Sequence, residues 1–581
     1  MKRKLTFDDF KKRIHTTRTD DENKKFEMYA QHIKNFAEML KKKVDDAKAN
    51  NQRIVGFFDF DCDGIMSALE TKRMIPEINV HIGDRYSDGY GIPESGIAKL
   101  KKGDLVICGD MGSTEEDKIM KIKEITGNYP IIIDHHEVSE KMEKYPLMLN
   151  FNKKAYNLSL DARPDWCTAG LMMQLTKNWD NMSLEDKRIN LIYSTFATIA
   201  DVVKVNSGYD NNRKDILNGF NLINNFDISQ YDNALYYFLF RCEIPQTIDT
   251  KTIQFTINPC LNAPGRIGTI NEHKNEDGTI MSGGQFVFEL LNPYSKLSDA
   301  DRVKNIDELI AINQNRKDME KKAKISPEYL KFIREEKDKP VLVCYLPDLH
   351  KGICGRIAQS LETDYGKPAI CFCGKGDDVT GSARNAEGYP SFMNITEKAI
   401  KSIIGEKGLG GHPDAFGLHT KESDINAIKT ALENIYKYIV PQEKTVRTAD
   451  VHTFTVDNFG QLEPFGPDFP FPVADETIEV TKSNMRVMKE GWTSITQDDI
   501  KYFGQQKDMP IKVGDTLKVQ GDIQINHYKG VDIIQVSMDK YEVGRSKNIS
   551  SVTNSTKDTN DSKDTNDSKD TNDSKEDKED R

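Results

Sequence analysis

The pattern of apolar and polar positions changes at residue 53 of this chain. From there, short apolar runs rich in β-branched residues alternate with amphipathic stretches. Each run is too short for a buried helix, and such runs between helical stretches are typical of strands in a parallel sheet. We therefore predict an α/β sheet with strands at Ile54–Phe58, Ile78–Ile82, Leu105–Cys108 and Ile131–Ile133.

The residues before this region have a helical pattern. Residues 5–50 are highly charged, and their apolar positions recur at alternating spacings of three and four, as on one face of a helix. The positions that carry this pattern are Phe26, Tyr29, Ile33, Phe36 and Leu40. We predict an N-terminal helical segment over 1–50, followed by a first α/β domain over 51–295.

The rest of the chain predicts a second lobe, a small barrel and a tail. Residues 296–336 are charged and mostly free of glycine and proline, which predicts one long helix joining two lobes. A second, smaller α/β pattern follows over 337–444. Alternating strands separated by turns over 445–545 predict an OB-like β-barrel. Residues 546–581 contain the sequence Lys-Asp-Thr-Asn-Asp-Ser three times and few apolar residues, which predicts a disordered acidic tail.

The charge balance narrows the classes of function. The 581 residues include 81 Lys and Arg against 92 Asp and Glu, a formal net charge of −11. Such a chain does not bind nucleic acid by charge excess, so a polyanion must enter a local basic groove or be held through metal ions. No apolar run approaches the ~20 residues that span a membrane, and no signal-peptide pattern begins the chain. Nine cysteines without a CxxC pair indicate buried thiols in a reducing cytosol, so we expect a cytoplasmic protein.

An aspartate follows each predicted strand of the first sheet within two residues. These aspartates are Asp59, Asp84, Asp110 and Asp134. In open α/β sheets, ligands bind at the carboxyl ends of the strands. Acidic side chains at these points are therefore candidates for a functional site.

The first strand end opens a cluster of three carboxylates. Asp59, Asp61 and Asp63 alternate along an extended segment, so their side chains can converge on a hard cation. With Gly64 and Glu70 they also match the EF-hand pattern, but an EF-hand needs a helix before the loop, and a strand is predicted there. Taken alone, the cluster also fits a solvated acidic turn.

Further Asp and His side chains stand at the ends of neighbouring elements. They are Asp110 after the third predicted strand, Asp134, His135 and His136 after the fourth, and Asp201 after a later apolar run. Carboxylates combined with imidazole suit manganese or magnesium, and a shared carboxylate can bridge two ions. The pattern therefore predicts a metal site at one edge of the sheet.

Taken together, these residues resemble the four motifs of the DHH phosphoesterase family. The motifs are Asp61-x-Asp63-Gly64, Asp110, Asp134-His135-His136, and Asp201 within Ala-Asp-Val-Val. The glycine-rich run 410–417 resembles the signature of the DHH-associated domain, and 381–385 resembles its other substrate loop. Further segments are similar to those of RecJ-like single-strand-specific exonucleases of the family, namely 84–91, 262–266 and 462–466. The resemblance implies a two-lobed DHH phosphoesterase core with a parallel-sheet N-lobe.

The resemblance implies a two-metal site. Asp110 would bridge the two ions, and Asp61 would complete the first site. The second site would be completed by Asp63, His135 and Asp201.

The resemblance also implies catalytic residues and one departure. His136 would contact the scissile phosphate as ligand or proton donor, next to Asp134 of the same motif. Relatives commonly have a His four residues before the first motif aspartate, and here that residue is Phe57. Asp59, two residues further on, is the candidate for the missing ligand.

The substrate-binding residues implied by the resemblance come from both lobes. They are Arg85, Arg266, Ser382, Arg384, Gly411 and His412. Arg85, Ser382 and Arg384 would hold a terminal 5′-phosphate, and His412 would face the substrate from the second lobe. On local pattern alone, Gly411 also fits a tight turn and Arg384 a surface ion pair.

We expect a metal-dependent 5′-to-3′ exonuclease that releases 5′-mononucleotides from single-stranded DNA. Two divalent cations, Mn²⁺ before Mg²⁺, would activate water for the hydrolysis. Two alternatives stay open, a DHH phosphodiesterase for short oligonucleotides or cyclic dinucleotides, and a non-catalytic DNA-binding replication scaffold. Expected partners are single-stranded DNA and single-strand-binding or replication and repair proteins, with the chain acting as a monomer away from membranes.

The predicted barrel contains candidate contacts for bases. Tyr502, Phe503 and Tyr528 fit either base stacking or barrel core, and core is the expectation for Phe503. Residues 445–545 carry 11 basic and 16 acidic residues, so binding DNA would need a local basic face. The candidates for that face are Lys482, Arg486, Lys489 and Lys529.

Overall fold

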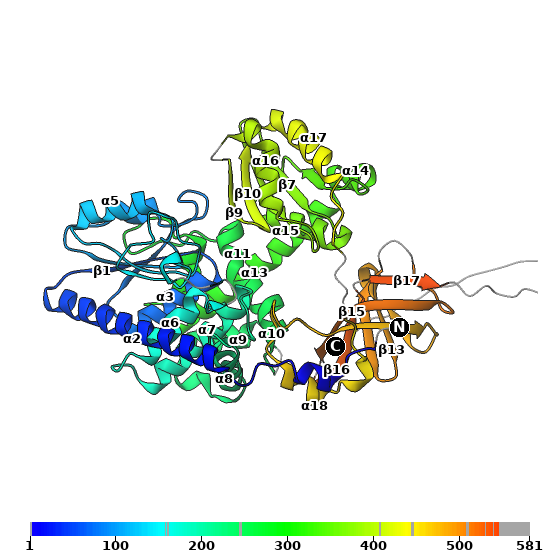
Figure 1. The fold of residues 1–581 in the computed structure, drawn as a ribbon, viewed down its shortest axis with the longest axis horizontal. Helices are drawn as coiled ribbons and strands as arrows, with labels where there is room; N and C mark the ends of the chain where they lie inside the picture. The colour runs from blue at the N-terminus through cyan, green and yellow to red at the C-terminus, as the bar shows by residue number, and fades with distance from the viewer. Residues whose placement is uncertain are drawn as a thin grey trace, which may run out of the picture.

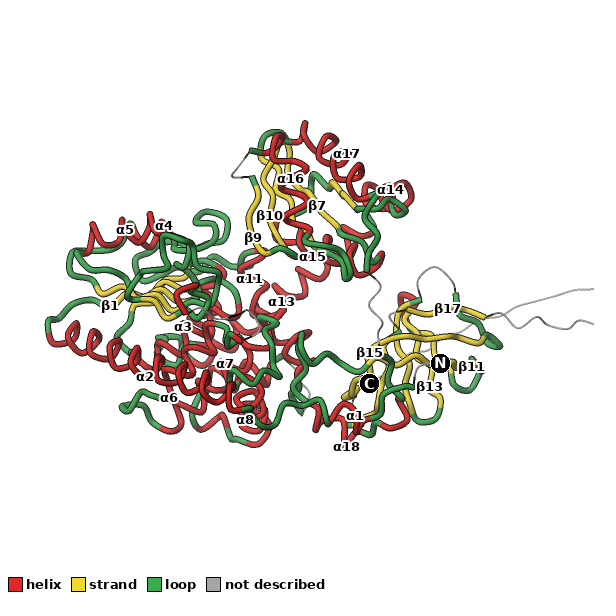
Figure 2. Tube along the Cα trace, in the orientation of Figure 1, coloured by secondary structure: helices red, strands yellow, loops and turns green. Residues whose placement is uncertain are grey.

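The structure, a computed structural model, describes residues 3–544 apart from 157–158, 160–161, 243, 245–246, 406–407, 443–446, 507–509, 529 and 539. The predicted tail over 546–581 and the candidate Lys529 lie outside the described residues. Figure 1 shows a first lobe in blue to green, a second lobe in yellow-green and a strand-rich domain in orange. Figure 2 shows that each of these parts has its own strands.

A parallel five-stranded sheet forms the centre of the first lobe. Its strands lie in the order β2 (Asn79–Ile82), β1 (Ile54–Phe58), β3 (Leu105–Gly109), β4 (Ile131–Ile133) and β5 (Met148–Leu149). Every neighbouring pair is parallel. All residues of β1, β3 and β4 are buried, which is why their sequences are continuous apolar runs. The predicted parallel sheet is confirmed.

Helices cover both faces of this sheet. One face packs on α2 (Asp20–Ala49), α3 (Cys62–Met74), α6 (Thr168–Lys177) and α7 (Leu184–Ala200), and the other on α4 (Glu94–Ile97) and α5 (Glu116–Thr126). The remaining helices of the lobe are α8 (Asn212–Asn225), α9 (Asn233–Arg241), α10 (Thr250–Thr252), a π-helix (Ile253–Ile257), α11 (Asn258–Ile267) and α12 (Gly283–Leu291). No helix among the described residues combines the length and apolar character needed to cross a membrane.

The single connecting helix predicted over 296–336 is instead two helices, α13 (Asp299–Lys324) and α14 (Pro327–Glu336). The side chain of Ser326 accepts the amide of Tyr329, and Pro327 takes the first position of α14. Because proline lacks an N–H and disfavours helical backbone in the residue before it, one continuous helix cannot pass this point. Of these two helices, α13 is the one that packs on both lobes, on α11 of the first and on α15 of the second.

The second lobe is a smaller α/β unit. Its sheet has the order β6 (Leu342–Tyr345), β7 (Ala369–Lys375), β8 (Asp378–Arg384), β10 (Ala415–Thr420) and β9 (Leu409–His412). Only β6 and β7 are parallel. One face packs on α14 and α15 (Lys351–Tyr365), and the other on α16 (Phe392–Ile404) and α17 (Ile425–Tyr436).

The third part is rich in strands. Its sheet has the order β11 (Val473–Glu479), β15 (Thr516–Tyr528), β16 (Val531–Ser537), β14 (Ile500–Gln505), β13 (Trp492–Gln497) and β12 (Met485–Val487), with β17 (Lys540–Gly544) also on β15. A short helix, α18 (Val456–Phe459), precedes these strands. β14 and β16 are parallel, whereas the other pairs are antiparallel.

The core position predicted for Phe503 is wrong. Side chains alternate along β14, and Tyr502 is the buried residue at 2% exposure. Phe503 points the other way and is half-buried, with its ring stacked on Trp492 at a centroid distance of 5.0 Å. Tyr528 is 63% exposed.

The N-terminal segment contacts two parts of the molecule. Leu5 forms a parallel bridge with Ala449, and Phe10 of α1 (Phe7–Lys11) packs edge-on against Phe454. Figure 1 accordingly places the N-terminus at the strand-rich domain, while α2 lies along the first lobe. The helical segment predicted over 1–50 therefore links the two parts.

A segment near the start of the strand-rich domain docks on the first lobe. Arg213 of α8 donates hydrogen bonds to the backbone carbonyls of Leu462 and Glu463 at 2.7 Å each. A Cβ at Gly466 would lie 2.8 Å from Val205, so only glycine allows this approach. The segment 462–466 thus has a packing role that its sequence did not reveal.

Candidate active site

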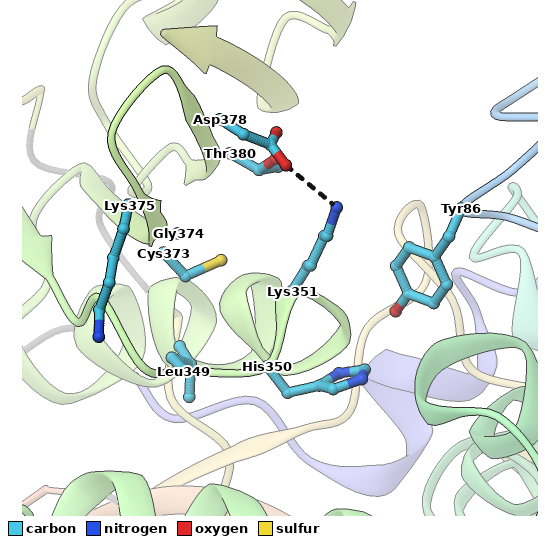
Figure 3. A pocket seen from close by; sticks show the side chains of 9 residues that line it. All are labelled: Tyr86, Leu349, His350, Lys351, Cys373, Gly374, Lys375, Asp378 and Thr380. Atoms are coloured by element: carbon cyan, nitrogen blue, oxygen red, sulfur yellow. Dashed lines mark ion pairs between the residues drawn. The ribbon is translucent and has the colours of Figure 1, made fainter. Parts of the chain in front are cut away.

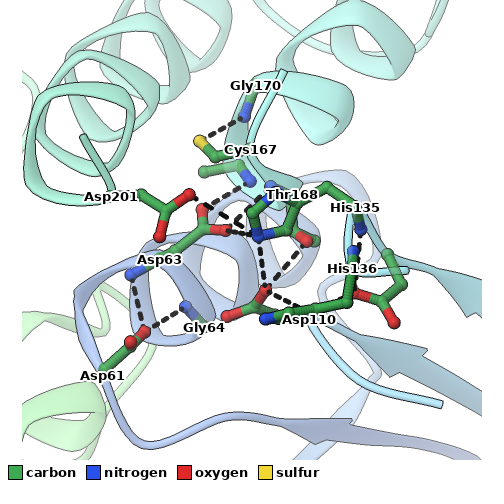
Figure 4. A network of polar contacts seen from close by, with 12 residues as sticks. Asp61, Asp63, Gly64, Asp110, His135, His136, Cys167, Thr168, Gly170 and Asp201 are labelled. Carbon is green, nitrogen blue, oxygen red and sulfur yellow. Dashed lines mark hydrogen bonds and ion pairs between the residues drawn. The ribbon is translucent and has the colours of Figure 1, made fainter. Parts of the chain in front are cut away.

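Carboxylates and imidazoles from several elements converge at the carboxyl edge of the first sheet (Figure 4). In the described part of the chain, three sets of side chains have potential metal-ligating atoms within 4.8 Å of one another. The sets are Asp59 with Asp61 and Asp110, Asp63 with His135 and Asp201, and Asp110 with His135 and His136. Asp110 and His135 each belong to two sets, so neighbouring sets share a ligand.

The local backbone orients these carboxylates. Asp110 follows β3 with a φ of 62°, and its amide donates to the carbonyl of Ile133 at 3.0 Å. The hydroxyl of Thr168 donates to Asp110 at 3.1 Å. Asp63, in the first turn of α3, accepts the amides of Thr168 and Ala169 at 2.8 Å each. The ends of β3, α3 and α6 therefore hold two of the carboxylates in place.

The acidic cluster is a strand–turn–helix and not an EF-hand. β1 precedes it, and Asp61 caps α3 by accepting the amides of Asp63 and Gly64 at 3.1 and 3.3 Å. Glu70 is fully buried within α3, and Asp63 is only 2% exposed. The EF-hand alternative is wrong, and a solvated acidic turn does not describe these residues either.

The carboxylates of this cluster repel one another. Burial and then the charge of Asp61 raise the pKa of Asp59 to about 8. Burial and neighbouring carboxylates also hold the pKa values of Asp61, Asp110 and Asp201 above their usual range. One buried oxygen of Asp201 has no hydrogen-bond partner among the described residues. Hard divalent cations would offset the repulsion and supply that partner, so these residues fit Mn²⁺ or Mg²⁺.

We expect divalent cations to raise the melting temperature, and more at pH 8 than at pH 6. The pKa of Asp59 is about 8 in the folded protein and ~3.9 in an unfolded chain, so the folded state keeps the proton that the unfolded state loses. Stability without metal therefore falls as pH rises between these values, while metal competes with fewer protons. The measurement is thermal unfolding with Mn²⁺ or with a chelator, and an equal metal-induced rise at both pH values would contradict this expectation.

Asp134 orients the two histidines. Its carboxylate accepts the backbone amides of Ser113, His135 and His136, and lies 2.8 Å from Nδ1 of His136. Burial opposes ionisation of Asp134, but these bonds and the imidazole charges lower its pKa below the usual value. Asp134 therefore positions the two histidines and belongs to none of the three ligand sets.

The two histidines have opposite protonation preferences. Burial and then the charge of His136 lower the pKa of His135, which favours the neutral form that a metal ligand needs. Burial also opposes charge on His136, but Asp134 and further carboxylates outweigh it and raise the pKa of His136 to about 10. The His136 side chain is 59% exposed, so a protonated imidazole stands at the entrance of the cluster.

The position where relatives commonly have a histidine is closed to metal. Phe57 is fully buried, and a Cβ at Gly96 of α4 would lie 2.6 Å from its ring. Asp59, two residues further on, instead groups with Asp61 and Asp110. This placement supports Asp59 as the replacing ligand.

Two arginines of the first lobe lie beside the carboxylate cluster. The guanidinium of Arg85 stands 5.6 Å from the ring centroid of Phe60 and 5.4 Å from that of Tyr90. Burial and then the charge of Arg85 lower the pKa of Arg266 to about 10, which leaves Arg266 charged at neutral pH. Neither arginine has an ion-pair partner among the described residues. Adjacent guanidinium groups that form no ion pair have N–H donors available for an anion such as phosphate.

The second lobe brings its predicted residues toward these arginines. Arg384, the last residue of β8, donates to the hydroxyl of Ser382 at 3.2 Å. Burial lowers the pKa of Arg384, and the charges of Arg356 and Arg85 act in the same direction. Arg384 is half-buried and hydrogen-bonds within its own strand, unlike a surface ion pair.

The glycine-rich run forms the β9–β10 hairpin. Gly411 has a φ of 137°, and a Cβ there would lie 2.8 Å from Cα of Phe416, so the hairpin itself accounts for this glycine. The amide of Asn385 donates to the carbonyl of Asp414 at 2.8 Å, which ties the hairpin turn to the end of β8. His412 is the last residue of β9, and its side chain lies outside the described part of the chain.

Two residues of the site lacked any motif in the sequence. Thr168 contacts two metal-ligand candidates from the start of α6. Arg356 of α15 adds positive charge beside the predicted arginines, with its Nε 3.4 Å from Glu320.

Asp84, by contrast, does not join the cluster. It accepts the amides of Tyr86 and Ser87 at 2.9 Å each and so organises the loop after β2.

Two family models match this chain. The model described as "DHH family, N-terminal domain" matches residues 53–200, and the "DHHA1 domain" model matches residues 338–438. The chain therefore carries a DHH domain followed by a DHHA1 domain. Among known proteins, the single-stranded-DNA-specific exonuclease RecJ of Dickeya dadantii is 24% identical over 477 residues, which are 76% of this chain and 77% of that protein. The RecJ of Bacillus subtilis is 23% identical over 513 residues, 84% of this chain and 61% of that protein.

Solved structures show the same relationship at the level of fold. RecJ of Thermus thermophilus in complex with Mn²⁺ has a TM-score of 0.67 and 17% identity, covering 88% of this chain and 72% of the other. The complex of RecJ with Mg²⁺ from the same organism has a TM-score of 0.62 and 16% identity, covering 88% and 70%. This DHH protein is therefore RecJ-like in its fold over most of its length.

Proposed function

We propose that this DHH protein is a metal-dependent exonuclease that removes 5′-mononucleotides from the 5′ end of single-stranded DNA. The observation that carries the proposal is the placement of Arg85 and Arg266, which have no ion-pair partner among the described residues, beside the overlapping metal-ligand sets. One DNA end would occupy both places at once. Its terminal phosphate would bind the arginines, and its first phosphodiester would lie at the metal-ligand cluster. The RecJ relatives are named as exonucleases specific for single-stranded DNA.

In the proposed reaction, metal ions would activate the water, and side chains would donate a proton and bind the terminal phosphate. Two bound divalent cations would activate water and stabilise charge on the phosphoryl oxygens. Asp134 engages Nδ1 of His136, which leaves Nε2 of the protonated ring free to donate to the phosphate or to the departing 3′-oxygen. Arg85, Ser382 and Arg384 would bind the terminal phosphate and so set the cut one nucleotide from the end.

Two alternatives have less support from the molecule. A phosphodiesterase for dinucleotides would need only the two lobes, whereas here a strand-rich domain is docked on the first lobe through Arg213 and Glu463. A non-catalytic scaffold would have lost ligands, whereas Asp61, Asp110 and His135 lie in three overlapping sets. Both observations favour an active enzyme for a polymer.

The test compares a long single strand, the same strand in a duplex, and a dinucleotide, each with a 5′-phosphate or a 5′-hydroxyl. We expect Mn²⁺-dependent release of mononucleotides, fastest from the 5′-phosphorylated single strand. Faster hydrolysis of the dinucleotide would favour the small-substrate phosphodiesterase. Binding of the strand without any hydrolysis in Mn²⁺ or Mg²⁺ would favour the scaffold.

Replacing Arg384 with glutamine is expected to weaken recognition of the 5′-phosphate. A charge-assisted hydrogen bond contributes about 1.5–3 kcal/mol, so kcat/KM for 5′-phosphorylated strands should fall about 10- to 100-fold. The value for 5′-hydroxyl strands should change little. Arg334→Gln, at an exposed position of α14 in the same lobe, is the matched control. An equal loss on both substrates would argue against a phosphate-binding role.

The proposed enzyme uses Mn²⁺ in preference to Mg²⁺ and acts as a cytoplasmic monomer. Mn²⁺ fits better than Mg²⁺ because His135 adds a nitrogen ligand to the carboxylates, and calorimetric titration should give two sites. We infer a monomer acting in the cytoplasm, where the nine free cysteines would stay reduced. Single-strand-binding, replication or repair proteins are the expected partners beside the DNA.

A further inference from the structure

The first turn of α15 touches both lobes. A Cβ at Gly352 would lie 1.8 Å from the backbone carbonyl oxygen of Arg266 and 2.6 Å from the hydroxyl oxygen of Tyr86, both in the first lobe. Real side chains do not approach so closely, so only glycine is compatible with this contact. Backbone of the second lobe therefore rests directly on backbone of the first.

Tyr86 completes the contact. Its hydroxyl donates to the carbonyl of Arg266, and its ring stands edge-on to His350, the residue that caps α15, at a centroid distance of 5.9 Å. The ammonium of Lys351 lies 5.9 Å from the same ring. In Figure 3 the hydroxyl end of Tyr86 points toward this helix end, and Tyr86, His350 and Lys351 are among the residues that line a cavity of about 440 Å³. The loop that carries Tyr86 is held by the hydrogen bonds to Asp84 described above.

The same turn also supports the residues proposed to bind the terminal phosphate. Three residues after Gly352, a Cβ at Gly355 would lie 3.0 Å from the hydroxyl oxygen of Ser382 and 3.2 Å from Nη2 of Arg384. One turn of helix is therefore in contact with Arg266 on one side and with Ser382 and Arg384 on the other.

We infer that Tyr86 and Gly352 form a spacer that sets the distance between the metal-ligand cluster and Ser382 and Arg384, the terminal-phosphate residues of the second lobe. The spacer is a positioning device, because neither residue belongs to the ligand sets or the proposed phosphate contacts. The inference rests on the proposed function, since it concerns which bond of a 5′-phosphorylated strand is presented for hydrolysis. Misplacing reacting groups by about 1 Å can cost ~10²-fold in rate, so a rigid spacer has a measurable effect.

The variants for the test are Gly352→Ala, Tyr86→Leu and Tyr86→Phe. Gly352→Ala pushes against the Arg266 carbonyl, and Tyr86→Leu removes the hydroxyl and the ring, so both should alter the spacing. For both we expect the ratio of kcat/KM for 5′-phosphorylated over 5′-hydroxyl strands to fall at least ~10-fold, with some products longer than mononucleotides. Tyr86→Phe, which keeps the ring, should restore most of the ratio.

Two further variants are matched controls. Gly460→Ala adds a Cβ where nothing lies within 4 Å. Tyr129→Leu removes a ring that is 39% exposed, close to the 41% of Tyr86. Both should keep the ratio and the product length of the wild type. All variants should keep the Mn²⁺-induced rise in melting temperature, because none of the substituted residues belongs to the metal-ligand sets.

The outcomes separate this inference from the proposed function. Wild-type protein without metal-dependent hydrolysis would overturn the proposed function and the spacer with it. An active wild type beside Gly352→Ala and Tyr86→Leu variants with unchanged ratio and products would overturn the spacer alone. So would an equal loss on both substrates, which indicates a general structural role. If Gly352→Ala does not fold, the partly exposed Tyr86→Leu decides.

Discussion

The Asp110→Asn variant is expected to lose Mn²⁺-dependent hydrolysis by about 10³-fold or more while remaining folded. Asp110 belongs to two of the three ligand sets, so its carboxylate would serve both ions of the proposed two-metal site. A neutral amide offers one weaker ligand oxygen, and several kcal/mol of transition-state stabilisation correspond to a loss of this size. The measurement is single-turnover cleavage of a 5′-phosphorylated single strand with Mn²⁺.

Asparagine tests the charge of Asp110 without disturbing the backbone. The residue has a φ of 62°, a conformation that asparagine tolerates far better than alanine. The amide oxygen can still accept the hydroxyl of Thr168. Because burial and neighbouring carboxylates hold the pKa of Asp110 well above its usual range, removing the charge should not lower the metal-free melting temperature. The Mn²⁺-induced rise in that temperature should shrink.

An aspartate at the opposite end of the same strand provides the control. Asp104 precedes β3, is 2% exposed and pairs with Arg53 at 2.5 Å. Asp104→Asn should lower the melting temperature, since it removes the charge of a buried carboxylate that pairs with the partly exposed Arg53, but leave cleavage per folded molecule near the wild-type rate. Near-normal cleavage by Asp110→Asn would rule out the metal role assigned to this residue.

The second large effect is expected for His136→Gln, with a loss of about 10²-fold or more in kcat. The raised pKa of about 10 keeps the imidazole protonated at neutral pH, and glutamine cannot supply that proton. Because the side chain is 59% exposed, the variant should stay folded, and loss of the ion pair with the buried Asp134 should lower the melting temperature by only a few degrees. His452→Gln, at an exposed position of the strand-rich domain, is the matched control.

Further variants of His136 and Asp134 distinguish a proton donor from a metal ligand at His136. His136→Lys should recover part of the rate, since it restores a positive charge. Asp134→Asn should lower the pKa of His136 and shift the pH optimum of cleavage toward acid, and it should add little to His136→Gln because the two residues act as a unit. A His136→Gln variant that loses the Mn²⁺-induced rise in melting temperature would instead make His136 a ligand.

The parallel sheet was predictable because strands that are buried on both faces consist of continuous apolar residues. β1, β3 and β4 coincide with continuous apolar runs, and the aspartates that follow them lie together since parallel strands end at one edge. The resemblance to a family added the roles of residues that local pattern left open, such as Asp61 and Asp201.

Other features depended on details that the pattern could not resolve. The alternation along β14 can be read in two registers, and the structure buries Tyr502 and turns Phe503 outward. The connecting helix breaks at Ser326, where a capping side chain and the following proline outweigh an otherwise helical composition. The strand-end Asp84 accepts hydrogen bonds from the loop that follows it and stays outside the carboxylate cluster, because β2 lies at the edge of the sheet.

The sequence by itself determined the fold class, the first lobe's strands and the carboxylates at their ends, because these follow from local periodicity and short motifs. Only the tertiary structure decided how distant residues meet. Thr168 joins the carboxylates, Arg266 stands beside Asp61, and Gly352 fits against the first lobe. Such contacts are made by the packing of whole lobes, and no spacing along the chain encodes the distance between two surfaces.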